Sequence, residues 1–198
     1  MLEFHNHAGA RKLRISDAVL SHLRRYRQYG STACEAGGQL FARFGREAIT
    51  IELATGPRIR DKRRTRFSFA PSRRLEVEEI KACFIKGLHF VGDWHTHPEG
   101  RPNPSLRDLA SMAECYRRSR HDLDALVMII VGTDEFPHGL WIGLHAEKGF
   151  TPLLDNAIVP QKGPFHSGNG EGIQVMSGET IQPFQAIDNV FKGNDVLI

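Results

Sequence analysis

The stretch from Leu88 to about Arg118 constrains the fold more than any other part of the chain. Its first part, up to the tetrapeptide His95-Thr96-His97-Pro98, predicts a strand that ends at a turn. The next six residues, EGRPNP, predict a tight connection because they contain a glycine and two prolines. Ser105 follows and can cap a helix that runs to about Arg118. The stretch therefore predicts a strand, a turn and a helix in direct succession.

The spacing of apolar residues predicts further elements on both sides of this stretch. Helices are expected from Ser16 to about Gln28 and from Pro71 to Lys86, and strands at residues 39–44, 48–54, 124–131 and 140–145. The basic segment before Pro71 is expected to be a loop, although Phe67 and Phe69 have the period-two spacing of a strand. On the helix after Ser105, five apolar residues are expected to face the core: Leu106, Leu109, Ala110, Ala113 and Tyr116.

The length of 198 residues is enough for one domain with a core of its own. We divide the chain into an N-terminal extension (1–12), one domain (13–150) and a Gly-rich C-terminal extension (151–198). The longest apolar run, Ala125 to Val131, is too short to cross a bilayer, and the first residues lack the apolar segment of a secretory signal. The three cysteines form no CxxC pair, which favours a reducing compartment. We therefore expect a cytoplasmic protein without a membrane partner.

The net charge of +3 is distributed unevenly along the chain. Eight basic residues and one acidic residue lie between Arg58 and Arg74, so this segment carries +7 and the rest carries −4. This distribution argues against a protein that coats nucleic acid. The basic segment could bind an acidic folded partner together with Phe67 and Phe69, or it could be a solvated loop with phenylalanines in the core. Both interpretations remain open at this point.

A possible metal site lies at the end of the predicted strand. His95 and His97 are two residues apart, so their imidazoles point to the same face. Asp108 lies one turn into the following helix and can complete a set of two nitrogens and one oxygen. Three protein ligands leave a position for water, as in catalytic zinc sites. A single His-x-His pair is often a coincidence, and Ser105 and Asp108 could merely cap the helix. The joint spacing of the four residues favours zinc.

The spacing H-T-H-P-(x)6-S-L-R-D resembles the JAMM signature, H-x-H-x(7)-S-x(2)-D, of the JAB/MPN metalloproteases. That family also has an upstream glutamate before a glycine and an apolar strand, and Glu35 in the segment EAGGQLF occupies this position. Over about residues 13 to 146, the resemblance implies an α/β fold, the mixed-sheet MPN/JAB fold related to cytidine deaminases, with flanking helices. It also implies one zinc ion held by His95, His97 and Asp108.

The resemblance further implies catalytic roles for Glu35 and Ser105. Glu35 is expected to be the general base that takes a proton from water and returns it to the leaving amine. The Ser105 hydroxyl is expected to donate to the developing oxyanion. Without a zinc site, Glu35 would be read as an ordinary surface acid. Asp93 could orient a ligand imidazole or lie at the surface, and Cys34 is expected to be a small buried thiol.

The run GDWHTHPEGRPNPS most resembles the bacterial JAB peptidases of CBASS antiphage operons. That resemblance implies an isopeptidase of antiviral defence, acting at the C-terminus of a ubiquitin-like protein or of a conjugated CD-NTase. An E1/E2-like conjugating enzyme would work in the same pathway. Two alternatives are a hydrolase of a sulfur-carrier protein–amino acid adduct and a non-catalytic MPN scaffold, which usually lacks the zinc ligands. Nucleic-acid binding through the basic segment is a weaker alternative, and it predicts a steep dependence on salt.

Overall fold

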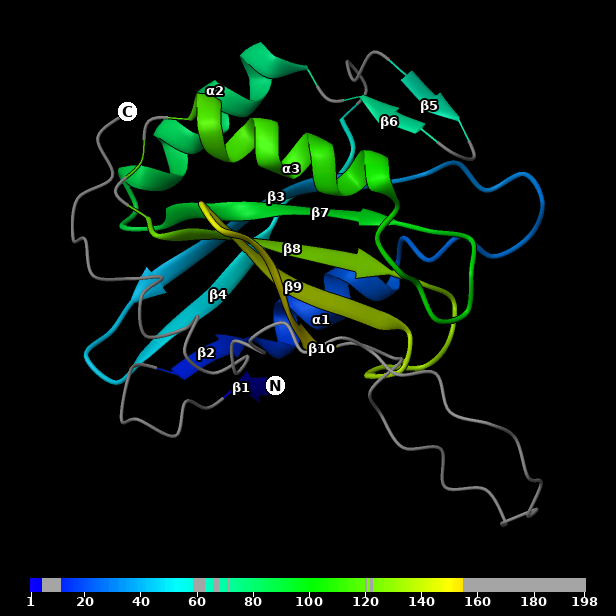
Figure 1. Ribbon diagram of the computed structural model, residues 1–198, viewed down its shortest axis with the longest axis horizontal. Helices are drawn as coiled ribbons and strands as arrows, with labels where there is room; N and C mark the ends of the chain where they lie inside the picture. The colour runs from blue at the N-terminus through cyan, green and yellow to red at the C-terminus, as the bar shows by residue number, and fades with distance from the viewer. Residues whose placement is uncertain are drawn as a thin grey trace, which may run out of the picture.

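The computed structural model describes residues 1–4, 12–58, 63–65, 68–70, 72–119, 121 and 123–154. Within these ranges the chain forms ten strands and three helices (Figure 1). The strands are β1 (Leu2–Phe4), β2 (Lys12–Ile15), β3 (Gly37–Phe44), β4 (Ala48–Ala54), β5 (Arg63–Thr65), β6 (Ser68–Ala70), β7 (His89–Thr96), β8 (Ala125–Val131), β9 (Leu140–Ala146) and β10 (Gly149–Leu154). The helices are α1 (Asp17–Arg24), α2 (Arg73–Phe84) and α3 (Leu106–Arg118).

Eight of the described strands form one mixed sheet in the order β1-β2-β4-β3-β7-β8-β9-β10. Two neighbouring pairs, β2 with β4 and β7 with β8, are parallel, and the others are antiparallel. The order places β3 and β7 in the middle of the sheet, with β8 next to β7. Every residue of β8 is buried, as is typical of a strand covered on both faces. The expected α/β fold with a mixed sheet and flanking helices is confirmed.

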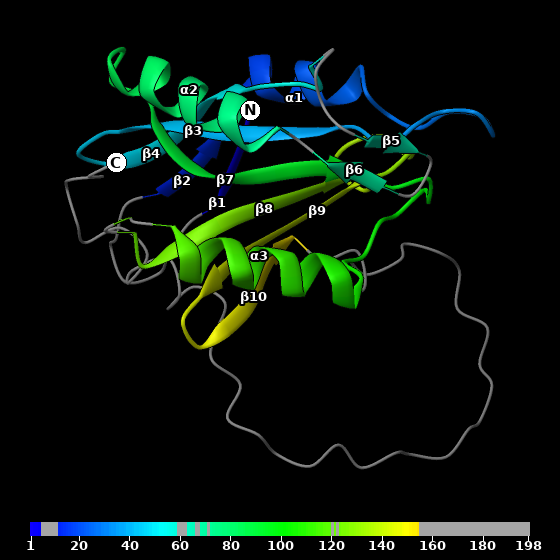
Figure 2. The ribbon, with the colours of Figure 1, turned by 90° about the horizontal axis from the view of Figure 1, so that it is seen from above.

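The helices cover both faces of this sheet. On one face, Asp93 of β7 contacts Cys115 of α3, and α2 also packs against β7. On the other face, the indole of Trp94 packs against Tyr26, just after α1, with ring centroids 5.4 Å apart. Figure 1 shows α2 and α3 together above β7 and α1 on the opposite side, and Figure 2 shows α3 running along β8 and β9. The C-terminal end of β7 is therefore flanked by the beginning of α3.

The chain segments outside residues 13–150 contribute strands to the sheet. β1 pairs with β2, with Leu2 opposite Ile15, although we expected an extension there. β10 continues to Leu154 and pairs with β9. The rest of the C-terminal extension, from residue 155 onward, lies outside the described residues. None of the helices in the described ranges is long and apolar enough to span a bilayer.

The expected core face of α3 is wrong at two positions. Leu106 is 86% exposed and Ala110 is also exposed, whereas Met112 and Cys115 are buried. Asp108, Met112 and Cys115 follow the spacing i, i+4 and i+7, so they share one face of the helix. This face is turned toward the sheet and the two histidines, which leaves Leu106 on the opposite side.

The basic segment is not simply a loop. β5 and β6 pair as an antiparallel hairpin, with Thr65 opposite Ser68, and Phe67 lies outside the described residues. In both views the hairpin lies near the beginning of α3 and the end of β7 (Figures 1 and 2). Three arginines at the ends of the segment pair with acidic residues of α2: Arg58 with Glu79, Arg73 with Glu76, and Arg74 with Glu78. Part of the segment's charge is therefore compensated within the chain.

Candidate metal centre

The two histidines lie where the central strand β7 ends. His95 is the last residue but one of β7, and His97 follows the strand directly. Gly37 of β3 lies opposite His95 on one side and Ile130 of β8 on the other. The backbone N–H of His97 donates to the carbonyl of Val131 over 2.9 Å. The backbone is therefore held on both sides at His95 and by one hydrogen bond to β8 at His97, which fixes where both imidazoles start.

The turn after His97 is also held by backbone hydrogen bonds. The N–H of Thr133 donates to the carbonyl of Glu99 over 2.9 Å, and that of Asp134 donates to the carbonyl of Gly100 over 3.0 Å. These two donors lie in the loop that follows β8. The ends of the two parallel strands are thus joined beyond the sheet itself.

Asp108 reaches the histidines from the first turn of α3. Its position is fixed by a capping box, in which Ser105 Oγ accepts from the N–H of Asp108 over 3.2 Å. In return, Asp108 Oδ2 accepts from the N–H of Ser105 over 2.7 Å. The exposed fractions of the three side chains are similar, 16% for His95 and Asp108 and 18% for His97. All three are partly buried yet open to solvent on one side.

The distances between the three ligand atoms suit a tetrahedral metal ion. Nε2 of His95 and Nε2 of His97 are 3.2 Å apart. Asp108 Oδ1 lies 3.4 Å from the first nitrogen and Asp108 Oδ2 lies 3.4 Å from the second. Ligands about 2.0–2.1 Å from a tetrahedral zinc ion are separated by about 3.3–3.4 Å, so the residues present fit this ion. Within the described ranges, they are the one cluster of histidine, cysteine or acidic side chains with metal-binding spacing.

The electrostatics of the three side chains also favour a cation. Burial alone would raise the pKa of Asp108, but hydrogen bonds with His95 and His97 hold that pKa far below its ordinary value. Burial lowers the pKa of His97, but the hydrogen bond and negative charge of Asp108 outweigh it and raise the pKa overall. The carboxylate is therefore ionised at neutral pH, and its charge stabilises positive charge at the imidazoles.

Glu99 is a further residue at this site that the sequence analysis did not select. Its Oε2 lies 3.5 Å from Nδ1 of His97. A carboxylate beside Nδ1 fixes the tautomer that leaves Nε2 available for a metal. The only sequence signal was an acidic residue two positions after the second histidine, and Glu99 is 60% exposed like many surface acids.

The structure brings Glu35 to the same site from the loop between α1 and β3. The N–H of the next residue, Ala36, donates to Oγ1 of Thr96 over 3.0 Å, and the N–H of Thr96 donates to the carbonyl of Ala36 over 2.9 Å. Burial raises the pKa of Glu35, while the nearby charges of His95 and His97 oppose this rise. A carboxyl group with a raised pKa is suited to accept and release a proton near neutral pH.

Two expectations about neighbouring residues need correction or refinement. Cys34 is exposed rather than buried, because the loop that contains it lies at the surface. Asp93 points between α2 and α3, where its Oδ2 lies 3.9 Å from Sγ of Cys115. Burial and the charge of Glu76 raise the pKa of Asp93 to about 7. Asp93 thus contacts the helix-covered side of the sheet through Cys115 rather than a ligand imidazole.

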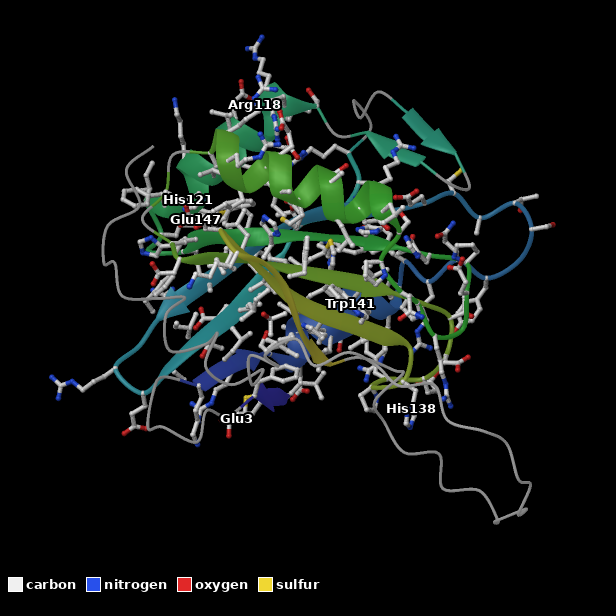
Figure 3. The ribbon with its side chains drawn as sticks, viewed as in Figure 1. Glu3, Arg118, His121, His138, Trp141 and Glu147 are labelled. Atoms are coloured by element: carbon white, nitrogen blue, oxygen red, sulfur yellow. The ribbon has the colours of Figure 1, made fainter. Side chains whose placement is uncertain are left out.

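Two other histidines of the domain lie at the far end of α3 from Asp108. His121 packs on Tyr116 with ring centroids 4.7 Å apart, and His145 packs on the same tyrosine at 5.4 Å. Figure 3 shows His121 beyond the C-terminal end of α3. These histidines belong to an aromatic cluster rather than to the metal centre.

Comparison with known proteins identifies the family. A family model described as prokaryotic homologs of the JAB domain matches residues 17–141, from α1 into β9. This range includes Glu35 and all residues of the candidate metal centre. The chain belongs to the prokaryotic JAB family. The family expected from the JAMM spacing is therefore confirmed.

Three similar proteins illustrate the relationship of this JAB chain to others. A protein of Pseudomonas aeruginosa named CD-NTase/cGAS isopeptidase is 32% identical over 143 residues, which cover 71% of this chain and 90% of the relative. An Escherichia coli protein of the same name is 28% identical over 159 residues, covering 79% and 93%. A Sinorhizobium fredii protein named "Probable metalloprotease y4qB" is 31% identical over 86 residues, covering 40% and 52%.

Proposed function

We propose that this JAB chain is a zinc-dependent isopeptidase that hydrolyses the amide bond at the C-terminus of a ubiquitin-like protein or of a CD-NTase joined to its target. The observation that carries the proposal is the separation of 3.2–3.4 Å between the ligand atoms of His95, His97 and Asp108. The names of the relatives in Pseudomonas aeruginosa and Escherichia coli support the choice of a CD-NTase as the conjugated protein.

The ion would be held by His95, His97 and Asp108, and when bound it supplies a Lewis acid for the scissile carbonyl and lowers the pKa of water. A carboxylate oxygen of Glu35 takes the proton of the attacking water and returns it to the amine nitrogen as the C–N bond breaks. The hydroxyl of Ser105 donates to the carbonyl oxygen as that oxygen gains negative charge. Its cap bond uses Ser105 Oγ as an acceptor, so the hydroxyl proton is available for this donation.

The β5–β6 hairpin is the segment that we propose binds the substrate tail. It lies near the end of β7 and the beginning of α3 in both views (Figures 1 and 2). An extended C-terminal tail can pair with an exposed strand edge through backbone hydrogen bonds. The conjugate itself would be formed by an E1/E2-like enzyme, and the chain would act in the cytoplasm as part of antiviral defence.

A cleavage assay tests the proposed activity. The substrate is a CD-NTase fused through its C-terminus to a reporter, and we expect cleavage at the junction that a chelator blocks and added zinc restores. Glu35→Gln should bind one zinc ion per chain but lose turnover, whereas Glu47→Gln, which changes an exposed acid far from the site, should behave as the wild type. A purified protein that holds no zinc would contradict the proposal and favour the scaffold alternative. Cleavage of a sulfur-carrier adduct alone would show that the substrate is this adduct and not a conjugated CD-NTase.

A further inference from the structure

A chain of buried polar groups connects the loop that carries Glu35 to the residue between the two histidines. Thr96 is fully buried and Gln28 is 3% exposed. Oγ1 of Thr96 donates to Oε1 of Gln28 over 2.9 Å, and Nε2 of Gln28 donates to the carbonyl of Ala33 over 3.2 Å. Oγ1 of Thr96 also accepts from the N–H of Ala36 over 3.0 Å. Glu35 therefore lies in a short segment that is held both before and after it.

Each group in this chain has its direction set by its neighbour. The Thr96 hydroxyl accepts one hydrogen bond and donates one, so its proton points to Gln28. The Gln28 amide accepts at its oxygen and donates at its nitrogen, and a flipped amide would lose the bond to the Ala33 carbonyl. Buried polar groups that satisfy one another in this way are rigid, because breaking any bond leaves its partner unpaired away from water.

Thr96 also belongs to the metal centre by its place in the sequence. It stands between His95 and His97, and its backbone N–H donates to the carbonyl of Ala36 over 2.9 Å. The same residue thus fixes the strand end that presents the imidazoles and the loop that presents Glu35. A small displacement of a catalytic group reduces the rate strongly, by about 10²-fold for about 1 Å.

We propose that Gln28 and Thr96 are positioning residues that hold the Glu35 carboxylate at a fixed position relative to the three metal ligands. This inference rests on the proposed function, in which Glu35 transfers the proton. Neither side chain touches the substrate or the reacting atoms, so both act through the backbone on either side of Glu35. Gln28 was expected only as the end of the first helix, and nothing in the sequence links it to the site.

The decisive comparison is between Thr96→Val and Thr96→Ser in the zinc-loaded full chain. Valine keeps the shape of threonine but removes the hydroxyl, whereas serine keeps the hydroxyl. We expect Thr96→Val to lower kcat by about 10- to 100-fold with KM and the zinc content unchanged. Thr96→Ser should restore most of kcat. Thr50→Val on β4, a half-buried position away from the loop, is the matched control and should leave kcat unchanged.

A second readout does not depend on activity. Hydrogen exchange at the Ala36 amide reports directly on its bond to Thr96, and we expect exchange at least about 10-fold faster in Thr96→Val while the amides of β8 keep their protection. Unchanged exchange at Ala36, or a kcat within twofold of wild type, would overturn the inference. If Thr96→Val does not fold, Gln28→Leu removes the acceptor of the Thr96 hydroxyl and the donor to the Ala33 carbonyl, and it should lower kcat and speed exchange at Ala36 by smaller factors; no change in either would overturn the inference. If the wild type cleaves no substrate, the proposed function fails, but the exchange data still decide whether Thr96 fixes the loop.

Discussion

Ser105 and Asp108 hold each other through two reciprocal hydrogen bonds of 3.2 and 2.7 Å. The carboxylate that faces the histidines is therefore also part of the capping box at the beginning of α3. One of its oxygens is oriented by the helix backbone before any ion binds, so the protein itself prepares the third ligand. The capping of α3 and the proposed metal binding would thus depend on the same residue pair.

Replacing Ser105 by alanine should affect both stability and catalysis. The variant loses the cap bond to the Asp108 N–H, so we expect the free energy of unfolding to fall by about 1 kcal/mol. It also loses the proposed donor to the oxyanion, so kcat should fall by about 10²-fold or more. Urea unfolding and the reporter assay measure the two effects. Ser105→Thr keeps the hydroxyl and should retain both, and a Ser105→Ala enzyme with normal kcat would limit Ser105 to a capping role.

Replacing Glu99 by glutamine should weaken zinc binding without unfolding the domain. Its carboxylate lies 3.5 Å from Nδ1 of His97, and such partners of ligand histidines raise metal affinity. Because Glu99 is 60% exposed, we expect a loss of about 10-fold, near the lower end of the range for such partners. A competition titration with a chromogenic chelator measures the affinity, and Glu47→Gln is the control. Equal affinities for wild type and Glu99→Gln would show that Glu99 does not orient His97.

Asp93 predicts a pH dependence of stability. Burial and the charge of Glu76 raise its pKa to about 7 in the folded chain, against 3.8 as its ordinary value. Between about pH 4 and pH 7 the folded state therefore keeps a proton that the unfolded state has lost, so stability falls as the pH rises through this window. Each pH unit changes the free energy of unfolding by at most about 1.4 kcal/mol.

The variant Asp93→Asn tests this dependence, because asparagine cannot ionise. We expect its stability to decline less than that of the wild type between pH 5 and pH 8, with the largest gain over the wild type at pH 8. Chemical denaturation at both pH values of zinc-loaded protein measures the difference. Parallel pH profiles for the two proteins would show that Asp93 is ionised in the folded state across this range.

Two residues of α3 should respond very differently to truncation. Met112 is 4% exposed and packs in the core, so Met112→Ala should cost about 2–5 kcal/mol. Leu106 is 86% exposed, and Leu106→Ala should change stability by less than about 0.5 kcal/mol. Thermal unfolding of both variants measures the contrast. A large loss of stability in Leu106→Ala would instead support the core face that the sequence pattern predicted, with Leu106 in it.

The sequence predicted those parts of the molecule that depend on local spacing. The strand–turn–helix unit appears where expected, with the helix capped at Ser105, because the cap, the prolines and the His-x-His pair all act within a few residues. The resemblance also indicated Glu35 as a partner of this unit, and the structure brings Glu35 close enough for His95 and His97 to influence its pKa.

The parts that were missed depend on contacts between distant segments. The short strand β2 is stabilised by pairing with β4, with Ile15 opposite Ile51. No local sequence pattern predicts that partner. The phase of α3 was misjudged because Ala110 and Leu106 fit an apolar stripe, whereas the position of Asp108 decides which face turns inward. The link between Gln28 and Thr96 likewise exists only after folding.

The hydrogen bonds from Thr133 and Asp134 to the turn after His97 have a consequence for engineering this enzyme family. They attach the loop after β8 to the turn beside the candidate metal centre, even though this loop contributes none of the candidate ligands. Loop grafts intended to change the preferred substrate should therefore keep these two hydrogen bonds and replace other surface segments. A graft that removed these two hydrogen bonds would be expected to weaken zinc binding at the proposed site before it lowered the stability of the domain.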